Sequence, residues 1–434
     1  MKRQVASWGR VTRGEHEWIS PSRRGELAVS LGASRLPGLA FGNGRSYGDV
    51  CLNGGGTLWS MRGLDRFIAF DVERGEIECE AGVLLAEMID AVLPAGWFLP
   101  VTPGTSLATI GGAVANDVHG KNHHRAGTFG EHVVSMQLER TDGTRIRCGP
   151  DENADWFAAT VGGMGLTGVI ESVRLRLRRV DGEWIDSESE SFETLEQFHV
   201  LSQAAVDGWE YTVAWVDCGP ASGGAARGVL FRGNHSISTD SPPARSERRV
   251  PIDSPLSLVN GPSVRAFNAL YRHRHRGCSA ARQHYRPFFY PLDSVHEWNR
   301  IYGRRGFYQY QCVIPAAAPP AATEDLLAAV ASSGSASFLA VLKTFSARPS
   351  AGMLSFPMAG TTLALDFPNA GEQTLRLFSS LDAIVNAAGG RLYPAKDACV
   401  KSADFKTAYP RWQEFCAYRD PGISSQMSRR LFGA

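Results

Sequence analysis

Asn116-Asp-Val-His-Gly-Lys-Asn-His-His-Arg-Ala-Gly-Thr-Phe-Gly130 is the most distinctive stretch of this chain, because it sets histidines, a lysine and an arginine among glycines. Glycine-rich sequence also occurs before it, at 103–112, and further away at 42–49 and 162–168. Clustered glycines allow backbone N–H groups to approach and bind a pyrophosphate. For any single stretch, tight turns would be the simpler explanation. Together the stretches favour a polar, phosphate-binding site.

A Rossmann dinucleotide site is the first alternative, because Gly42 and Gly44 match the start of its fingerprint. That fingerprint requires a helix directly after the turn and an acidic residue about 20 residues further on. Here the chain continues as Val50-Cys-Leu-Asn-Gly-Gly-Gly56, which cannot propagate a helix. The context therefore argues against a Rossmann site.

The composition is that of an ordinary globular protein. The chain has 434 residues, of which 43% are hydrophobic and 21% charged, and this length suggests about two or three domains. Its 45 basic and 44 acidic residues give a net charge of +1. Nucleic-acid binding usually needs a clear basic excess, so we expect no nucleic-acid partner.

The eight cysteines include no CxxC pair, so the sequence offers no zinc knuckle and we expect no metal site. Scattered thiols fit a reducing compartment better than a disulfide framework. The N-terminus is basic but lacks the apolar stretch of a signal peptide, and no run approaches the ~18 apolar residues that cross a bilayer. We expect a cytoplasmic, soluble protein, with peripheral contact at the inner face of the membrane.

Residue periodicity predicts a mixture of strands and helices. We expect two strands about a glycine turn in 67–81, a helix over 83–93 ended by Pro94 and Gly96, and a strand at 169–177. Further strands are expected at Trp209–Val216, Phe307–Ile314, Ser337–Lys343 and Thr361–Phe367, and further helices at Thr323–Ser332 and Gln373–Ala388. The segment 233–287 is rich in Ser, Pro, Arg and His, so we expect much of it to be a mobile excursion.

The spacing of GNGRSYGD, PGTSLATIGGAVANDVHGKNHHRAGTFGEHV and VGGMGLTGVI resembles the FAD domain of the vanillyl-alcohol-oxidase (PCMH-type) superfamily. Within it, the chain is similar to the decaprenylphosphoryl-β-D-ribose 2-oxidases, and the similarity extends to 306–315, 337–345 and 389–398. The resemblance implies an α+β fold with two domains. These are an FAD-binding domain of residues 1–182 and 390–434, and a substrate-binding domain of residues 183–389 built on an antiparallel sheet.

The resemblance also implies which residues contact FAD. By matching position these are Gly42, Asn43, Gly44, Arg45, Ser46, Tyr47, Gly48, Asp49, Val50, Gly104, Thr109, Ile110, Gly111, Gly112, Asn116, Asp117, Val118, His119, Ile170 and Tyr393. Many relatives attach FAD covalently through a histidine just before the serine of the first motif. Arg45 occupies that place here, so we expect non-covalent FAD.

Substrate-side residues carried over from the resemblance are Lys121, Gln309, Gln311, Lys343, Phe345 and Lys396. Their chemistry suits a sugar phosphate, because glutamine binds hydroxyls and lysine binds phosphate. Gln309 and Gln311 are two apart on a predicted strand and so face the same side. Without the resemblance, Lys343 would be read as a solvated strand end and His119 as a structural histidine.

One predicted strand departs from the pattern of the mycobacterial members. These carry a cysteine, modified by electrophilic inhibitors, in the strand that ends in Asp-Phe-Pro. Here Ala364 takes the place of that cysteine, and Thr362 replaces a neighbouring asparagine. Neither change affects the expected flavin site, but both bear on the choice of sugar or lipid.

The activity implied is oxidation of the 2-hydroxyl of a polyprenylphosphoryl-β-D-ribose to the keto sugar. Lys396 and His119 are the expected catalytic residues. A reductase partner would then complete an epimerisation that supplies an arabinose donor for cell-wall glycans. The alternatives are an aldonolactone or alditol oxidase acting on a free sugar with oxygen, which usually has the histidine missing at Arg45, and a non-catalytic flavin-binding scaffold. Aromatic and basic residues in Pro262–Pro287 suggest contact with a membrane surface.

Overall fold

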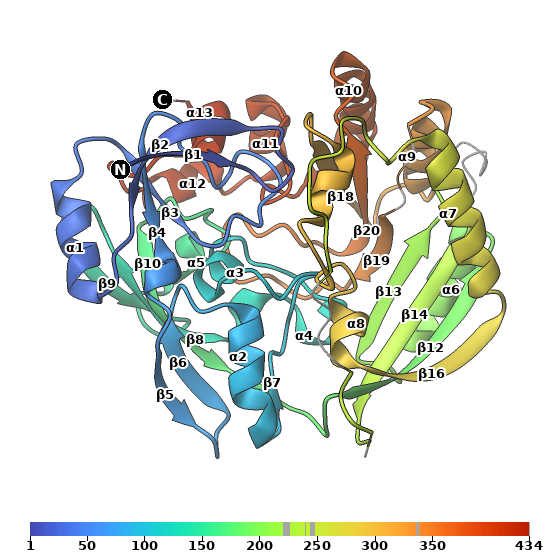
Figure 1. Cartoon of the computed structure of the whole chain (residues 1–434), viewed down its shortest axis with the longest axis horizontal. Coiled ribbons are helices and arrows are strands. Elements are labelled where there is room, and N and C mark those ends of the chain that lie inside the picture. The colour runs from blue at the N-terminus through green and yellow to red at the C-terminus, as the bar shows by residue number, and fades with distance from the viewer. Residues whose placement is uncertain (220–225, 239, 244–247, 336, 338, 434) are drawn as a thin grey trace.

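The computed structural model describes residues 1–219, 226–238, 240–243, 248–335, 337 and 339–433, and every statement on structure below concerns these residues. Figure 1 shows two smaller sheets on the left of the molecule and one large sheet on the right. Helices flank all three. The arrangement confirms the expected α+β fold.

The N-terminal part contains two sheets. The first has the order β1-β2-β4-β3, with β1 (Lys2–Ala6), β2 (Arg13–Ile19), β4 (Thr57–Ser60) and β3 (Gly38–Phe41). The second has the order β5-β6-β10-β8-β9, with β5 (Phe67–Asp71), β6 (Glu76–Glu80), β10 (Val169–Arg176), β8 (Val133–Glu139) and β9 (Arg145–Cys148). A short pair joins β11 (Arg178–Arg179) to β7 (Trp97–Phe98).

The large sheet has eight strands among the described residues, and every pairing in it is antiparallel. Its order is β16 (Cys278–His284), β12 (Trp184–Phe192), β14 (Gly228–Ser236), β13 (Tyr211–Val216), β19 (Ala340–Phe345), β20 (Gly360–Pro368), β18 (Phe307–Pro315) and β21 (Arg391–Leu392). A separate parallel pair joins β15 (Arg248–Arg249) to β17 (Val295–His296). The expected antiparallel sheet is therefore present.

The helices are α1 (Arg24–Ala33), α2 (Leu85–Val92), α3 (Ile110–Ala115), α4 (His123–Ala126), α5 (Ala154–Thr160), α6 (Leu195–Ala205), α7 (Gly261–Arg274), α8 (Tyr285–Phe289), α9 (Ala321–Ser332), α10 (Glu372–Ala387), α11 (Ser402–Ala408), α12 (Trp412–Cys416) and α13 (Gln426–Phe432).

The two faces of the large sheet differ. Tyr310 packs against Phe378 of α10, with ring centroids 5.2 Å apart. Because successive residues of a strand point to opposite faces, Gln309 and Gln311 face away from α10.

The C-terminal segment returns to the N-terminal part, as Figure 1 shows for α11–α13 beside β1 and β2. The backbone N–H of Gly38 donates to Gly422 at 2.9 Å, and that of Gln426 donates to Leu52 at 2.7 Å. Such contacts are needed if an FAD-binding domain is made of 1–182 and 390–434. The boundaries themselves, including 183–389 for the second domain, stay predictions.

Most predicted elements are present with shifted ends. The helix expected over 83–93 is α2, followed by a 3-10 turn with Pro94 and by Gly96 at φ +79°, which is the termination that these two residues favour. The strand expected from Trp209 begins at Tyr211, because the Trp209 N–H still donates to Ala205 of α6. The strand expected at 337–343 is β19, displaced toward the C-terminus, and residue 338 lies outside the described residues.

The segment 233–287 is more regular than we expected. Its described part contains the end of β14, helix α7, strand β16 and the start of α8, while residues 239 and 244–247 lie outside the described residues. Apolar periodicity did not predict α7, because the helix buries only Val264 and Asn268 and its sequence has low hydropathy. The excursion therefore contains regular elements, and its mobility stays a prediction.

Candidate active site

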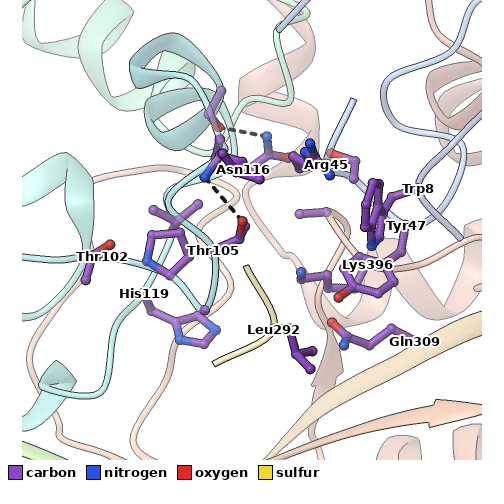
Figure 2. Close-up of a pocket in the computed structure, with 18 of the residues that line it drawn as sticks. Trp8, Arg45, Tyr47, Thr102, Thr105, Asn116, His119, Leu292, Gln309 and Lys396 are labelled. Carbon is purple, nitrogen blue, oxygen red and sulfur yellow. Dashed lines mark hydrogen bonds between the residues drawn. The ribbon is translucent and has the colours of Figure 1, made fainter. Parts of the chain in front are cut away.

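A cavity of about 610 Å³ lies between the glycine-rich loops and the inner face of the large sheet. Figure 2 shows Asn116 and Arg45 on one side of it, and His119, Gln309 and Lys396 pointing toward a common space. The segment that follows α8, called the strap below, lines the cavity with Leu292 and Asp293. Asp293 fixes this strap to the glycine-rich loop, because its carboxylate accepts hydrogen bonds from Thr105 Oγ1 at 2.7 Å and from the Ser106 N–H at 2.7 Å.

The glycine-rich side of the cavity has the features of a cofactor cradle. A Cβ on Gly42 would lie 2.5 Å from Thr109 Oγ1, and Gly44 has φ +60°, so both positions require glycine. Arg45 Nε and Asn116 Oδ1 are buried and have no hydrogen-bond partner among the described residues. Closely approaching backbone with unpaired polar atoms fits a bound dinucleotide such as FAD.

Most of the residues expected to contact FAD line this cavity. They are Gly42, Asn43, Gly44, Arg45, Ser46, Tyr47, Val50, Gly104, Thr109, Gly111, Gly112, Asn116, Val118, His119, Ile170 and Tyr393. Gly48, Asp49, Ile110 and Asp117 do not line it. Asp49 instead pairs with Arg430, and Asp117 accepts hydrogen bonds from the Gly130 N–H and from Ser355 Oγ. Their contact with FAD stays a prediction, as it does for the residues that line the cavity.

Arg45 occupies the first glycine-rich loop beside Trp8, with its guanidinium carbon 4.2 Å from the Trp8 ring centroid. Stacking of this kind stabilises a cation whose hydration is reduced. Desolvation lowers the pKa of Arg45, although Asp293 and Glu297 oppose the effect. The side chain is therefore a fixed positive group at the cavity wall.

His119 links the glycine-rich loop to the large sheet. Lys343 Nζ donates to His119 Nδ1 at 3.0 Å, and the Gln311 side-chain amide lies 2.9 Å from His119 Nε2. A neutral imidazole has one acceptor nitrogen and one N–H. While Lys343 is protonated, Nδ1 accepts and Nε2 carries the proton, so Gln311 must present its amide oxygen, which an amide rotation allows. Burial, reinforced by the charge of Lys343, keeps the pKa of His119 well below its usual value.

A second cluster of polar side chains contains Lys396, Tyr47, Gln309 and Asp366. Lys396 Nζ lies 4.1 Å from the centroid of the Tyr47 ring, and Gln309 Nε2 donates to Asp366 Oδ1 at 2.6 Å. Desolvation lowers the pKa of Lys396 to about 8, against the opposing effect of Asp366. Burial raises the pKa of Asp366 to about 7. The amine is thus able to gain or lose a proton near neutral pH.

Two further lysines border the cavity beside His119. Lys121 Nζ donates to the Phe288 carbonyl, and desolvation lowers the pKa of Lys121 to about 7. Lys343 has its pKa lowered to about 7 by desolvation, with the positive charges of Lys121 and Lys396 adding to the effect. Bringing a phosphate close to these amines would favour their charged forms.

The structure also places residues that the sequence did not single out as site residues. Asp366 was predicted only as part of a strand, although its two-residue spacing from Ala364 puts it on the face of Gln309. Trp8, before the first motif, carried no sequence signal. Conversely, Phe345 does not line the cavity, since its ring packs against His119 and His123 at 4.9 and 4.5 Å. A substrate contact for Phe345 stays a prediction.

Comparison with known proteins identifies the chain's relatives. Residues 26–149 match the FAD binding domain family. The chain is 35% identical over 99% of its length to decaprenylphosphoryl-β-D-ribose oxidase of Mycolicibacterium smegmatis, of which it covers 97%. The chain belongs to the decaprenylphosphoryl-β-D-ribose oxidase family. It is also 32% identical over 80% of its length to an uncharacterised protein of Streptomyces coelicolor, and 28% identical over 40% to mouse L-gulonolactone oxidase.

Membership of this family makes the chain an FAD-dependent oxidoreductase. FAD held in the cradle would supply the hydride acceptor of the reaction. Ala364 and Thr362, where the resemblance implies a departure from mycobacterial members, both line the cavity. No group of three or more His, Cys, Asp or Glu side chains arranged to hold a metal ion occurs in the described part of the chain.

Proposed function

We propose that this protein oxidises the 2-hydroxyl of a polyprenylphosphoryl-β-D-ribose, or a similar lipid-linked sugar, to the keto sugar. The single observation that carries the proposal is the convergence of Lys396, Gln309, Gln311 and His119 beside the FAD cradle, with Lys121 and Lys343 next to them. Amides and an imidazole suit sugar hydroxyls, and the two lysines suit a phosphate ester. The name of the M. smegmatis relative supports the same substrate class.

In this proposal each side chain has a defined part in the reaction. Gln309 and Gln311 orient the ribose so that the C2–H bond points toward the cofactor. As the C2–H hydride leaves, the proton of the 2-hydroxyl passes to the neutral amine of Lys396 and the C–O bond becomes a carbonyl. Lys121 and Lys343 hold the phosphate, and the strap with Asp293 limits access of water.

The alternative, an aldonolactone or alditol oxidase acting on a free sugar with oxygen, is less supported. Its usual covalent histidine is absent at Arg45. The likeness to L-gulonolactone oxidase covers only 40% of the chain, whereas the likeness to the lipid-linked ribose oxidase covers 99%.

Anaerobic reduction of the holoenzyme tests the proposal. A polyprenylphosphoryl-β-D-ribose should bleach the flavin absorbance at micromolar concentration, while ribose, ribitol and gulonolactone should not. Bleaching by free sugars alone would favour the alternative oxidase. Absence of bleaching by every sugar, with FAD bound, would favour a non-catalytic scaffold.

Two partners belong to this proposal. A reductase that returns hydride to C2 from the opposite face would consume the keto sugar and complete an epimerisation. A membrane surface would present the lipid-linked substrate, and α7 exposes Phe267 by 40% and Leu270 by 68% beside basic residues. Tyr285, expected in the same surface, is instead buried. Among the described residues, no helix combines the length and hydropathy needed to cross a bilayer.

Liposome sedimentation tests the membrane contact. Arg274 and Arg276 are exposed, whereas Arg272 lies 3.8 Å from Asp217 and also holds α7 in place. Replacing Arg274 and Arg276 with glutamine should reduce sedimentation with vesicles containing phosphatidylglycerol. Unchanged sedimentation would make this segment an ordinary solvated surface.

A further inference from the structure

We propose that the isoprenoid chain of the substrate binds in an apolar arm of the cavity, between the inner face of the large sheet and helices α7 and α8. The arm is defined by Val213, Trp215, Phe231, Tyr271, Phe288, Leu339 and Val341, all of which line the cavity. The identity of the ligand rests on the proposed function. The location rests on strand register, burial and ring contacts.

Strand register sets a polar-to-apolar gradient across the sheet. Gln311 of β18 pairs with Ala364 of β20, Ala364 pairs with Val341 of β19, and Val341 pairs with Trp215 of β13. Side chains of directly paired residues lie on the same face. The row therefore passes from the glutamine beside His119, over a small alanine, to valine and tryptophan. At about 4.8 Å per strand it extends roughly 14 Å.

A second row continues the apolar surface. Val213 lies two residues from Trp215, so it shares the same face, and it pairs with Phe231 of β14. Val213, Phe231 and Val341 are half-buried. Their neighbours on the opposite face, Ala214, Leu230 and Leu342, are at most 1% exposed. An apolar wall that faces the cavity suits a hydrocarbon ligand, because binding removes the apolar surfaces of both the wall and the ligand from water.

Helix α7 forms a roof over the far end of the arm. Tyr271 contacts Trp215 with ring centroids 4.8 Å apart, and His275 contacts Phe231 at 5.2 Å. A hydrogen bond of 2.7 Å from Asn268 Nδ2 to Asp217 Oδ1 ties the same helix to the end of β13. Aromatic rings thus lie between the helix and the sheet at this end.

Lys343 and Lys121 lie between the polar and the apolar parts of the cavity. In the proposed substrate, the phosphate joins the ribose to the isoprenoid chain at the corresponding place. Lys343 is two residues from Val341 on β19, on the same face, and also contacts His119. Lys121 lies over the ring of Phe288, with its Nζ 4.6 Å from the ring centroid. The order along the cavity is therefore polar, cationic and apolar, which is the order of ribose, phosphate and isoprenoid in the proposed substrate.

Two substrate analogues test the arm in the holoenzyme. Farnesylphosphoryl-β-D-ribose and methylphosphoryl-β-D-ribose carry the same sugar phosphate and differ only in the chain. We expect the farnesyl compound to show a dissociation constant lower by at least about tenfold, because the chain buries apolar surface. The limiting rate of flavin reduction should agree within about twofold, because chain binding is equal in ground and transition states.

A charged substitution in the arm should remove this preference. Val341→Asp should raise the dissociation constant of the farnesyl compound by at least about tenfold more than that of the methyl compound, because the new carboxylate lies in the apolar arm. Its effect on the phosphate, through Lys343 on the same face, is common to both compounds. Val200→Asp is the matched control, since Val200 lies on α6 and is 63% exposed. Tyr271→Ala, on α7, provides a second arm variant that leaves the sheet intact, and it should weaken only farnesyl binding.

A binding assay separates this inference from the proposed function. Farnesyl phosphate, which lacks the sugar, should quench tryptophan fluorescence in the wild type and do so far less in Val341→Asp. If neither ribose analogue bleaches the flavin, the proposed function fails while this titration still decides the arm. Equal affinity of the wild type for the two analogues, or a farnesyl preference retained in Val341→Asp, would overturn the inference.

Discussion

Gln309 Nε2 donates to Asp366 Oδ1 at 2.6 Å, on the face of the large sheet that borders the cavity. The other carboxylate oxygen of Asp366 is buried and has no hydrogen-bond partner among the described residues. Asp366 thus fixes a glutamine that points at the substrate space and places a titratable group behind Lys396. Its effect on Lys396 is electrostatic, because the negative carboxylate raises a pKa that desolvation lowers to about 8.

The pH dependence of flavin reduction should report this relationship. If the neutral amine of Lys396 accepts the hydroxyl proton, the reduction rate rises with pH and levels off above an inflection near the pKa of about 8. Asp366→Asn keeps an acceptor for Gln309 but removes the negative charge, so the inflection should move to lower pH. Stopped-flow reduction between pH 6 and pH 9.5 measures it.

Asp382→Asn is the control for this profile. Asp382 accepts a hydrogen bond from Tyr310 on the opposite face of the sheet, and burial raises its pKa to about 6. Its replacement should leave the inflection in place. An inflection that stays fixed or rises in Asp366→Asn would exclude Asp366 as the group that sets the protonation of Lys396.

Lys396→Met should keep the fold and the bound FAD but slow flavin reduction by about 10²-fold or more, as expected when a preorganised polar group is removed from a reacting centre. The measurement is flavin bleaching at saturating substrate, with FAD content determined by absorbance. Lys401→Met, at an exposed lysine on the same segment, serves as control. Reduction at the wild-type rate would remove Lys396 from the mechanism.

Acid precipitation should release intact FAD into the supernatant, because Arg45 stands where a covalent histidine would be. An arginine that stacks on Trp8 and is positively charged does not form a bond to the flavin ring. The flavin absorbance of pellet and supernatant, together with the mass of the denatured chain, gives the result. Flavin retained in the pellet with a matching mass increase would contradict it.

Thiol-directed nitroaromatic compounds should form no covalent adduct in the cavity, because Ala364 offers no nucleophile. Cys51 lines the cavity as well, but burial raises the pKa of its thiol to about 12, so little reactive thiolate is present. The thiol of Cys312 points to the opposite face of the sheet, and burial raises its pKa to about 12. Ala364→Cys should restore modification, detected by mass spectrometry after flavin-dependent activation of the compound. A covalent adduct on any cavity residue of the wild type, Cys51 included, would disprove this prediction.

The sequence predicted the polar face of the sheet well, because period-2 spacing determines which residues share a face. That rule puts Gln309 and Gln311 on one face, and it also puts Asp366 on the same face as Ala364. The glycine-rich loops were equally visible, since positions such as Gly42 exclude a side chain.

Features that depend on contacts between distant segments were not predictable. Helix α7 has little apolar periodicity, and its place is set by Asp217 and by the rings of Trp215 and Phe231. The stacking of Trp8 on Arg45 depends on how the N-terminal segment crosses the first loop. Neither arrangement leaves a local pattern in the chain.

Isotopic substitution at C2 of the ribose tests the central claim most directly. Flavin reduction by polyprenylphosphoryl-β-D-ribose with deuterium at C2 should be slowed several-fold relative to the unlabelled compound, because the C2–H bond breaks as hydride leaves. Deuterium at C3 should leave the rate unchanged. An equal rate for the C2-labelled and unlabelled compounds in a single turnover, or an effect at C3 instead, would contradict oxidation of the 2-hydroxyl.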